Sequence, residues 1–361
     1  MAVTGDWLEV GRVRIGLAGV GRIGAFHAAT LRQLDQVDSL VVADADRARA
    51  AAVAARVGAE AVDTLAELFA AGIDGLAVAT ATEVHPDLII AAVDAGLPVF
   101  CEKPVALDIA GTLAVLDRVE RSDVPVQIGF QRRFDPGFRR ARTAVHSGQL
   151  GWVHTLRAGT LDPAPPAPAY IAASGGFFRD CSVHDFDAIR WVTGREVVEV
   201  YAVGVNRGAD FFRTAGDVDT CAALLTLDDD TIALVSGTRY NAAGYDVRLE
   251  VLGARDSISA GLDDRLPLRS AEPGVSWPAG PAYPNFIARF RAAYLAELAA
   301  FTEVVAGRAP VPCTVRDALE AGYLAQACEV SRRDHRPVPV AEVRDGPGGA
   351  GRRAGRKVGS R

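Results

Sequence analysis

The sequence lacks several features that would assign it to a specialised class of protein. Its five cysteines are odd in number, widely spread and form no C-x-x-C pair, which excludes a disulfide framework and a zinc ribbon. No apolar run approaches the roughly 18 residues of a membrane span. The first residues include Asp6 and Glu9, where a secretory signal would be basic and then apolar. We therefore expect a cytoplasmic protein with reduced thiols.

An excess of basic charge is also missing. The formal net charge is −6, which argues against nucleic acid or an anionic membrane as the main partner. The composition, 49% hydrophobic and 23% charged, is that of a globular protein. A length of 361 residues exceeds what one core usually holds and indicates two domains.

The first third of the chain alternates short aliphatic runs with alanine-rich segments of helical character. This rhythm predicts an α/β fold, in which right-handed crossovers build a doubly wound parallel sheet covered on both faces. It continues to about Phe130, so we place a Rossmann domain at residues 1–130. The helices that we expect there span residues 23–33, 46–57, 64–71, 85–95 and 108–121.

After residue 130 the rhythm changes. A helix at 136–146 is followed by several extended segments with few helices among them, and the acidic turn at 228–230 indicates a hairpin. Consecutive strands without crossovers favour a mostly antiparallel sheet, hence an α+β domain at residues 131–340. Helices are expected at 285–306 and 314–333. The glycine-rich, basic segment 341–361 is typical of a disordered tail.

A glycine-rich loop directly follows the first strand. Gly19, Gly21 and Gly24 form the pattern G-x-G-x-x-G and open the first helix. In a dinucleotide-binding loop, such glycines allow a tight turn, a close approach of the pyrophosphate and close packing of helix on strand. Asp44 ends the next strand, where a carboxylate accepts hydrogen bonds from the adenosine ribose and repels a 2′-phosphate. We expect an NAD site, although Arg47 lies close to Asp44 in the chain; a structural turn is the alternative.

Two constellations have the residue types that catalysis needs. Lys103 follows the strand LPVFCE, at the edge of a parallel sheet where ligands bind, and could donate to a substrate oxygen. Asp180, His184 and Asp187 share one face of an expected helix. An aspartate that orients a histidine is typical of a general base. A metal site lacks a further ligand with supporting spacing, and a capping aspartate beside a packed histidine remains the structural alternative.

Two further segments carry weaker indications. The stiff, proline-rich segment at 161–170 is interpreted as a wall of the active site. Arg132 and Arg133 close the last Rossmann strand, and we expect one of them to reach the ligand crevice.

Taken together, the glycine loop, CEKP, QIGFQRRFD and GGFFRDCSVHDFD resemble the glucose–fructose oxidoreductase/inositol dehydrogenase/MocA family, within which the inositol dehydrogenases are the nearest match. The resemblance covers about residues 13–340. It implies NAD as cofactor, oxidation of a ring hydroxyl of a polyol or sugar, and a homo-oligomer, either a dimer or a homotetramer, formed through the C-terminal sheet.

The resemblance also implies roles for individual residues. Lys103, Asp180 and His184 match the catalytic set of the family. The expected cofactor site comprises Gly19, Val20, Gly21, Arg22, Ile23, Gly24, Asp44, Ala79, Thr80, His85, Glu102 and Lys103. The expected substrate site comprises Lys103, Gln131, Arg132, Asp162, Asp180, His184, Asp187 and Tyr245. No metal is expected. Asp162 departs from the asparagine of some inositol dehydrogenases, which leaves the polyol open.

These expectations define an NAD-dependent inositol dehydrogenase that acts on myo-inositol or scyllo-inositol. One alternative is an NAD(P)-dependent sugar dehydrogenase or reductase of the same family. The other is a non-catalytic redox sensor that binds NAD. The presence of Lys103, Asp180 and His184 together argues against the sensor, because sensing needs only the glycine loop.

Overall fold

The computed structural model describes residues 11–345, and these residues divide into two compact units. The first unit comprises the chain up to Gln131 together with Ala292–Ala318, and the second comprises Arg132–Arg291 and the chain from Leu319 onward. Most of the expected basic tail lies outside the described residues, but Val340–Arg344 forms helix α12, so the tail does not begin at residue 341. No helix among residues 11–345 is long and apolar enough to cross a membrane.

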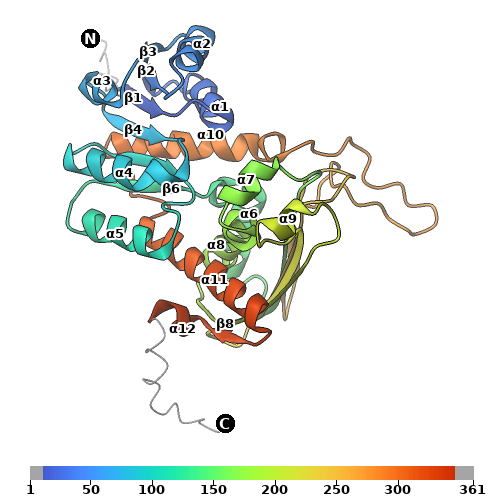
Figure 1. The fold of residues 1–361 in the computed structure, drawn as a ribbon. Coiled ribbons are helices and arrows are strands. Elements are labelled where there is room, and N and C mark those ends of the chain that lie inside the picture. The colour runs from blue at the N-terminus through green and yellow to red at the C-terminus, as the bar shows by residue number, and fades with distance from the viewer. Residues whose placement is uncertain (1–10, 346–361) are drawn as a thin grey trace, which may run out of the picture. The chain divides into compact units, whose positions relative to one another are not determined.

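The first unit is built on a parallel sheet of six strands in the order β3-β2-β1-β4-β5-β6, coloured blue to cyan in Figure 1. The strands are β1 (Val13–Ala18), β2 (Val37–Ala43), β3 (Glu60–Val62), β4 (Gly75–Val78), β5 (Val99–Glu102) and β6 (Val126–Gly129). The connecting helices are α1 (Arg22–Leu31), α2 (Arg47–Val57), α3 (Leu65–Ala70), α4 (His85–Asp94) and α5 (Ile109–Glu120), with a 3₁₀ turn η1 (Thr82–Val84) before α4. The order reverses between β1 and β4, which confirms the predicted doubly wound fold.

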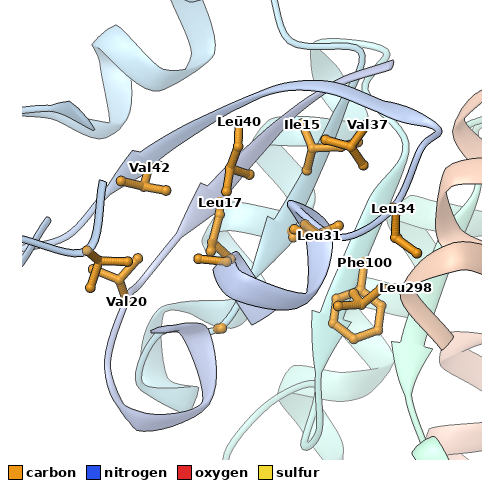
Figure 2. Packing of buried hydrophobic residues seen from close by; sticks show 14 of the residues in the cluster. Ile15, Leu17, Val20, Leu31, Leu34, Val37, Leu40, Val42, Phe100 and Leu298 are labelled. Carbon is orange, nitrogen blue, oxygen red and sulfur yellow. The ribbon is translucent and has the colours of Figure 1, made fainter. Parts of the chain in front are cut away.

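The core on one face of this sheet explains why a late segment belongs to the first unit. Leu298 and Phe301 of α10 (Phe286–Val305) pack with β1, α1 and Phe100 in one buried cluster, and Figure 2 shows Leu298 beside Phe100. The sequence placed this segment in the second domain. The unit boundary falls inside α10, close to Phe290, where the backbone leaves helical geometry.

The second unit contains a seven-stranded sheet in the order β12-β11-β7-β10-β9-β8-β13. Its strands are β7 (Val153–Leu161), β8 (Val197–Val205), β9 (Thr220–Leu227), β10 (Ile232–Thr238), β11 (Asp246–Gly253), β12 (Ser257–Ala260) and β13 (Val338–Pro339). Its pairs are antiparallel except β7 with β10, and the hairpin predicted around residues 228–230 joins β9 to β10. The sheet is thus mostly antiparallel, as predicted.

Helices accompany this sheet on one side. They are α6 (Pro136–His146), α7 (Pro168–Ala173), α8 (Val183–Thr193), α9 (Phe211–Thr214) and α11 (Val315–Asp334), with a 3₁₀ turn η2 (Gln131–Phe134) before α6 and a π-helical turn η3 (Phe178–Ser182) before α8. The hydroxyl of Ser331 on α11 accepts a hydrogen bond from the amide of Ala202 on β8 at 2.9 Å. The expected proline-rich wall is partly helical, because α7 begins at Pro168, and a proline fits the first turn of a helix.

Candidate active site

The glycine loop after β1 has the geometry of a dinucleotide-binding turn. Gly19 has a positive φ of 86°, and a Cβ there would lie 2.7 Å from the carbonyl oxygen of Ala79. A Cβ at Gly24 would lie 2.0 Å from the carbonyl oxygen of Gly19. At Gly21, by contrast, a Cβ would meet nothing within 4 Å. Gly19 and Gly24 therefore serve backbone packing, and Gly21 leaves room on the outer side of the loop.

This room lies at the start of α1. Gly21 is the N-cap of the helix, no side chain caps it, and the first turn, opened by Arg22 and Ile23, contains no acidic residue. The first amide groups of a helix have no partner within the helix and favour an anion. The loop therefore fits the pyrophosphate of a dinucleotide, which agrees with the prediction from the G-x-G-x-x-G pattern.

Asp44 lies at the end of β2 and is tied to the glycine loop. Its Oδ2 accepts a hydrogen bond from the amide of Val20 at 2.7 Å, and its Oδ1 accepts from the amide of Asp46 at 2.9 Å and from Arg49 Nη2 at 2.7 Å. Burial raises the pKa of this carboxyl, but the hydrogen bonds from Arg49 and the two amides outweigh burial and hold the pKa below its usual value. An ionised acceptor at this position fits a ribose diol.

The arginine beside Asp44 differs from the one that the sequence raised. Arg47 points to Asp63, with 3.2 Å between Nη1 and Oδ2, whereas Arg49 bonds to Asp44 and is half exposed. The helix places residue 49 over the strand end because three residues from the N-cap Asp46 complete almost one turn.

Two residues of the expected cofactor set have hydrogen-bond partners within the protein, and their contacts with the cofactor stay predictions. His85 is only 1% exposed, and its ring nitrogens lie 2.8 Å from the carbonyl oxygen of Pro104 and 3.2 Å from that of Thr80. Burial lowers the pKa of His85, which keeps the ring neutral. Glu102 Oε1 lies 2.6 Å from Nε2 of the buried His27 on α1. Both side chains therefore brace the turns after β4 and β5, and His27 is a residue that the sequence analysis missed.

Lys103 directly follows β5 in the first unit and is half-buried. Ala79 is buried after β4, and Thr80 follows it. These positions are the carboxyl ends of neighbouring parallel strands, where ligands of doubly wound sheets bind. The roles of Lys103, Ala79 and Thr80 nevertheless stay predictions.

In the second unit, Asp180 lies in η3 and not in the first turn of an α-helix as expected. The α-helix α8 begins only at Val183, and η3 carries Asp180 in a π turn, a distortion that often marks functional sites. Asp180 Oδ1 accepts a hydrogen bond from the Tyr170 hydroxyl at 2.8 Å, and Oδ2 accepts one from Arg239 Nη2 at 2.6 Å. His184 follows in the first turn of α8 and is half-buried.

The two arginines of QIGFQRRFD lie in buried ion pairs. Arg132 donates to Asp185 Oδ1 at 2.5 Å and to the Thr160 hydroxyl at 2.7 Å, and it is 2% exposed. Arg133 donates to both oxygens of Asp187, at 2.6 and 3.0 Å, and Asp187 is fully buried. Both side chains thus cross-link η2 to α8, and the substrate contacts expected for Arg132 and Asp187 stay predictions.

The remaining members of the expected substrate set differ in exposure. Gln131 and Tyr245 are buried, and Tyr245 packs edge-on against Phe290 with ring centroids 6.5 Å apart. Asp162 Oδ2 accepts a hydrogen bond from Arg239 Nη1 at 2.7 Å, and its side chain keeps 18% of its surface exposed. Asp162, Asp180 and Arg239 thus form one cluster, and the sequence analysis did not identify Arg239.

Comparison with known proteins agrees with this arrangement. Residues 13–130 match the oxidoreductase family with an NAD-binding Rossmann fold, and residues 138–259 match the C-terminal domain of the GFO/IDH/MocA family. The chain is 40% identical to the myo-inositol dehydrogenase Hyg17 of Streptomyces leeuwenhoekii over 330 residues, 91% of this chain and 99% of that protein. It is 34% identical to the myo-inositol 2-dehydrogenase of Thermotoga maritima, over 92% of this chain and 99% of that protein.

The solved structures give the same result. The scyllo-inositol dehydrogenase of Lactobacillus casei, solved with bound NAD(H) and scyllo-inositol, superposes with a TM-score of 0.82 at 30% identity and covers 91% of this chain and 99% of its own. The fold and the glycine loop thus define an NAD-dependent oxidoreductase. The chain belongs to the GFO/IDH/MocA family.

Proposed function

We propose that the protein oxidises one ring hydroxyl of myo-inositol or scyllo-inositol to the ketone, with NAD as the acceptor. The observation that carries this proposal is the similarity to two myo-inositol dehydrogenases over more than nine-tenths of the chain. The geometry of the glycine loop and Asp44 supports NAD as the cofactor. Bound NAD supplies the site that accepts the hydride from the hydroxyl-bearing carbon.

The residues of this chain handle the proton and the charge on oxygen. We assign His184 as the base that accepts the hydroxyl proton, with Asp180 stabilising the imidazolium that forms. The ammonium of Lys103 donates to the oxygen as negative charge develops there. A neutral imidazole can accept this proton and an imidazolium cannot, so the proposed role requires His184 to be neutral when the substrate binds.

The charges of the second unit support an unphosphorylated substrate. Arg132, Arg133 and Arg239 each bond to carboxylates, so these cations are already neutralised. Asp162 retains exposed surface, and a carboxylate there accepts hydrogen bonds from substrate hydroxyls but repels a phosphate. A ring polyol satisfies this arrangement better than a sugar phosphate does.

We further propose that the protein is a homo-oligomer, a dimer or tetramer formed through the outer face of the seven-stranded sheet. Tyr201, Leu224 and Leu234 lie side by side on β8, β9 and β10, and all three are exposed. An apolar row of this kind is typical of an interaction surface. A second copy of the chain would cover it symmetrically.

A cytoplasmic location is proposed on the chemistry of the cysteines. All five are buried and none of them forms a disulfide, and burial raises the pKa of Cys221 to about 12. Buried thiols without disulfides suit a reducing compartment.

The mechanism is tested with His184→Ala. Because a general base contributes roughly 10²–10⁴-fold, kcat for NAD-dependent oxidation of myo-inositol is expected to decrease by about that factor. The Kd for NAD, measured by protein fluorescence, should remain unchanged because the glycine loop is intact. Turnover close to that of the unmodified protein would remove His184 from the mechanism and leave it a packing role.

A further inference from the structure

A buried arginine in the second unit holds two carboxylates at once. Arg239 follows β10, and its side chain is only 4% exposed. Its Nη1 donates to Asp162 Oδ2 at 2.7 Å and its Nη2 donates to Asp180 Oδ2 at 2.6 Å. The guanidinium carbon lies 4.9 Å from the ring centre of Phe177. The planar fork is therefore fixed both by its two acceptors and by an aromatic face.

The two acids come from different elements and are brought together by this one cation. Asp162 directly follows β7, and Asp180 lies in η3. Their side chains are 18% and 9% exposed, so water screens their mutual repulsion poorly. Burial raises the pKa of Asp162, Arg239 opposes this increase, and the nearby charge of Asp180 adds to it. Arg239 thus offsets both the burial of Asp162 and its repulsion from Asp180.

Besides His184, whose imidazolium Asp180 is proposed to stabilise, four neutral or acidic groups interact with this cluster. The Tyr170 hydroxyl on α7 donates to Asp180 Oδ1 at 2.8 Å. The Cys181 thiol lies 3.8 Å from Asp162 Oδ2 and 3.9 Å from Asp180 Oδ2. Tyr245 from the start of β11 and Asp217 from the loop before β9 interact with the cluster electrostatically. None of these four groups could replace the positive charge of Arg239.

We propose that Arg239 is a positioning residue of the reaction, which keeps Asp180 and Asp162 ionised together and fixes Asp180 for its work on His184. This inference rests on the proposed function, in which Asp180 stabilises the imidazolium. Without Arg239, the two carboxylates share a single proton, as like charges in one site do. Asp180 then loses part of its negative charge, and its orientation is no longer fixed by the guanidinium.

A role of Arg239 in keeping both acids ionised and a purely structural role lead to different expected results in a double variant. If the damage in Arg239→Met comes from a proton shared between two acids, then removing the second acid must repair it. We expect kcat of Arg239→Met at saturating myo-inositol to decrease by about 10- to 100-fold, the scale of a misplaced reacting group. The double variant Asp162→Asn/Arg239→Met should regain at least about tenfold of that loss. The comparison uses kcat because Asp162 is itself an expected substrate contact.

The pH dependence provides a second readout. In Arg239→Met, raising the pH removes the shared proton, so the ratio of its kcat to that of the unmodified protein should increase with pH. In the double variant, no shared proton remains and the ratio should be nearly constant. A double variant whose loss equals or exceeds the product of the two single losses would overturn the proposal, as would a loss of less than about twofold in Arg239→Met.

Infrared spectroscopy separates this inference from the proposed function, because it needs no turnover. In difference spectra against the unmodified protein, which cancel the band of any acid that is protonated in both, such as Glu297, an additional carbonyl band of a protonated carboxylic acid is expected in Arg239→Met at neutral pH. The band should be absent from the double variant and from Arg239→Lys, which retains a cation. A band in all three proteins or in none would contradict the shared proton. If the unmodified protein failed to oxidise inositols, the band pattern would still decide whether Arg239 keeps the two acids ionised together.

A matched arginine of the same unit provides the control variant for effects on folding. Arg190 is 10% exposed and donates to both oxygens of Glu196 at 2.6 and 2.7 Å, so Arg190→Met removes a comparable pair outside the cluster. Its kcat should remain within about twofold of the original. If Arg239→Met failed to fold while the double variant folded, acid–acid repulsion would be the cause, which supports the proposal. If neither folded, Arg239 would be a packing residue and the proposal would be wrong.

Discussion

At the scale of single residues, the cofactor preference depends on the pair formed by Asp44 and Arg49. Asp44 offers a buried, ionised acceptor to a ribose, whereas the half-exposed Arg49 is a cation within reach of the same place. Asp44→Ala should weaken the binding of NAD by about 1–3 kcal/mol, the contribution of a charged hydrogen bond, and should weaken the binding of NADP less. Arg49→Ala should do the reverse and lower kcat/KM for NADP more than for NAD. Kinetics with both cofactors test this; equal losses for both cofactors in both variants would contradict it.

A second residue-scale prediction concerns Glu297 on α10. This carboxyl is fully buried, and neither of its oxygens has a hydrogen-bond partner among the described residues. Burial, and then the charge of Glu102, raise the pKa of Glu297 well above its usual value. The folded protein therefore keeps a proton that the unfolded chain releases as the pH rises through the ordinary glutamate pKa.

The sign of the stability effect follows from this difference. Above about pH 4.3, the unfolded state binds fewer protons at this position, so the free energy of unfolding decreases by about 1.4 kcal/mol per pH unit until the raised pKa is reached. Glu297→Gln removes this term and should be more stable than the original protein, by a margin that grows between weakly acidic and neutral pH. Urea unfolding of both proteins at several pH values measures this difference in the free energy of unfolding. A constant margin would mean that Glu297 is already ionised in the folded protein.

At the scale of the element, different glycines of the loop between β1 and α1 serve packing and cofactor binding. Gly24 has no room for a Cβ, and Gly21 has open space around it at a negative φ of −64°. Gly24→Ala should lower the free energy of unfolding by several kcal/mol, because backbone must move. Gly21→Ala should fold with nearly unchanged stability and yet lose at least about tenfold in NAD affinity. Thermal unfolding and NAD titration distinguish the two, and equal stability losses would contradict the distinction.

The outer face of β8, β9 and β10 supports an element-scale prediction about assembly. Leu234 lies between Leu224 and Arg157 in one row across the strands, so a charge there would disrupt a face-to-face contact without reaching the core. Leu234→Asp should shift the protein toward the monomer in light scattering. Leu268→Asp is the matched control, because this exposed leucine lies outside the strands. A monomeric unmodified protein, or dissociation by the control alone, would contradict the proposed interface.

At the scale of the whole molecule, local sequence patterns predicted most helices and strands, but they did not predict which distant side chains form ion pairs. The helical rhythm placed the ends of the eight helices whose bounds were predicted within two residues, because this signal acts over a few neighbouring residues; three of these helices begin after a capping aspartate, Asp46, Asp108 or Asp135. The short helices α7, α9 and α12 were not predicted, and α8 begins three residues later than expected. Arg239 was missed because its partners lie 77 and 59 residues away in the chain. The ion pair of Asp187 with Arg133 was missed because helical spacing does not reveal a partner 54 residues away. The π turn at Asp180 likewise leaves no mark in spacing.

We propose above that this NAD-dependent enzyme oxidises an unphosphorylated ring polyol of the inositol type. The most direct test is the kcat/KM for NADH formation with myo-inositol, scyllo-inositol, glucose and glucose 6-phosphate at equal concentrations, with NAD and NADP side by side. NAD with one of the two inositols is expected to give the highest value. Preference for glucose over both inositols would retain the mechanism but change the substrate, and preference for glucose 6-phosphate would contradict the site described for the second unit.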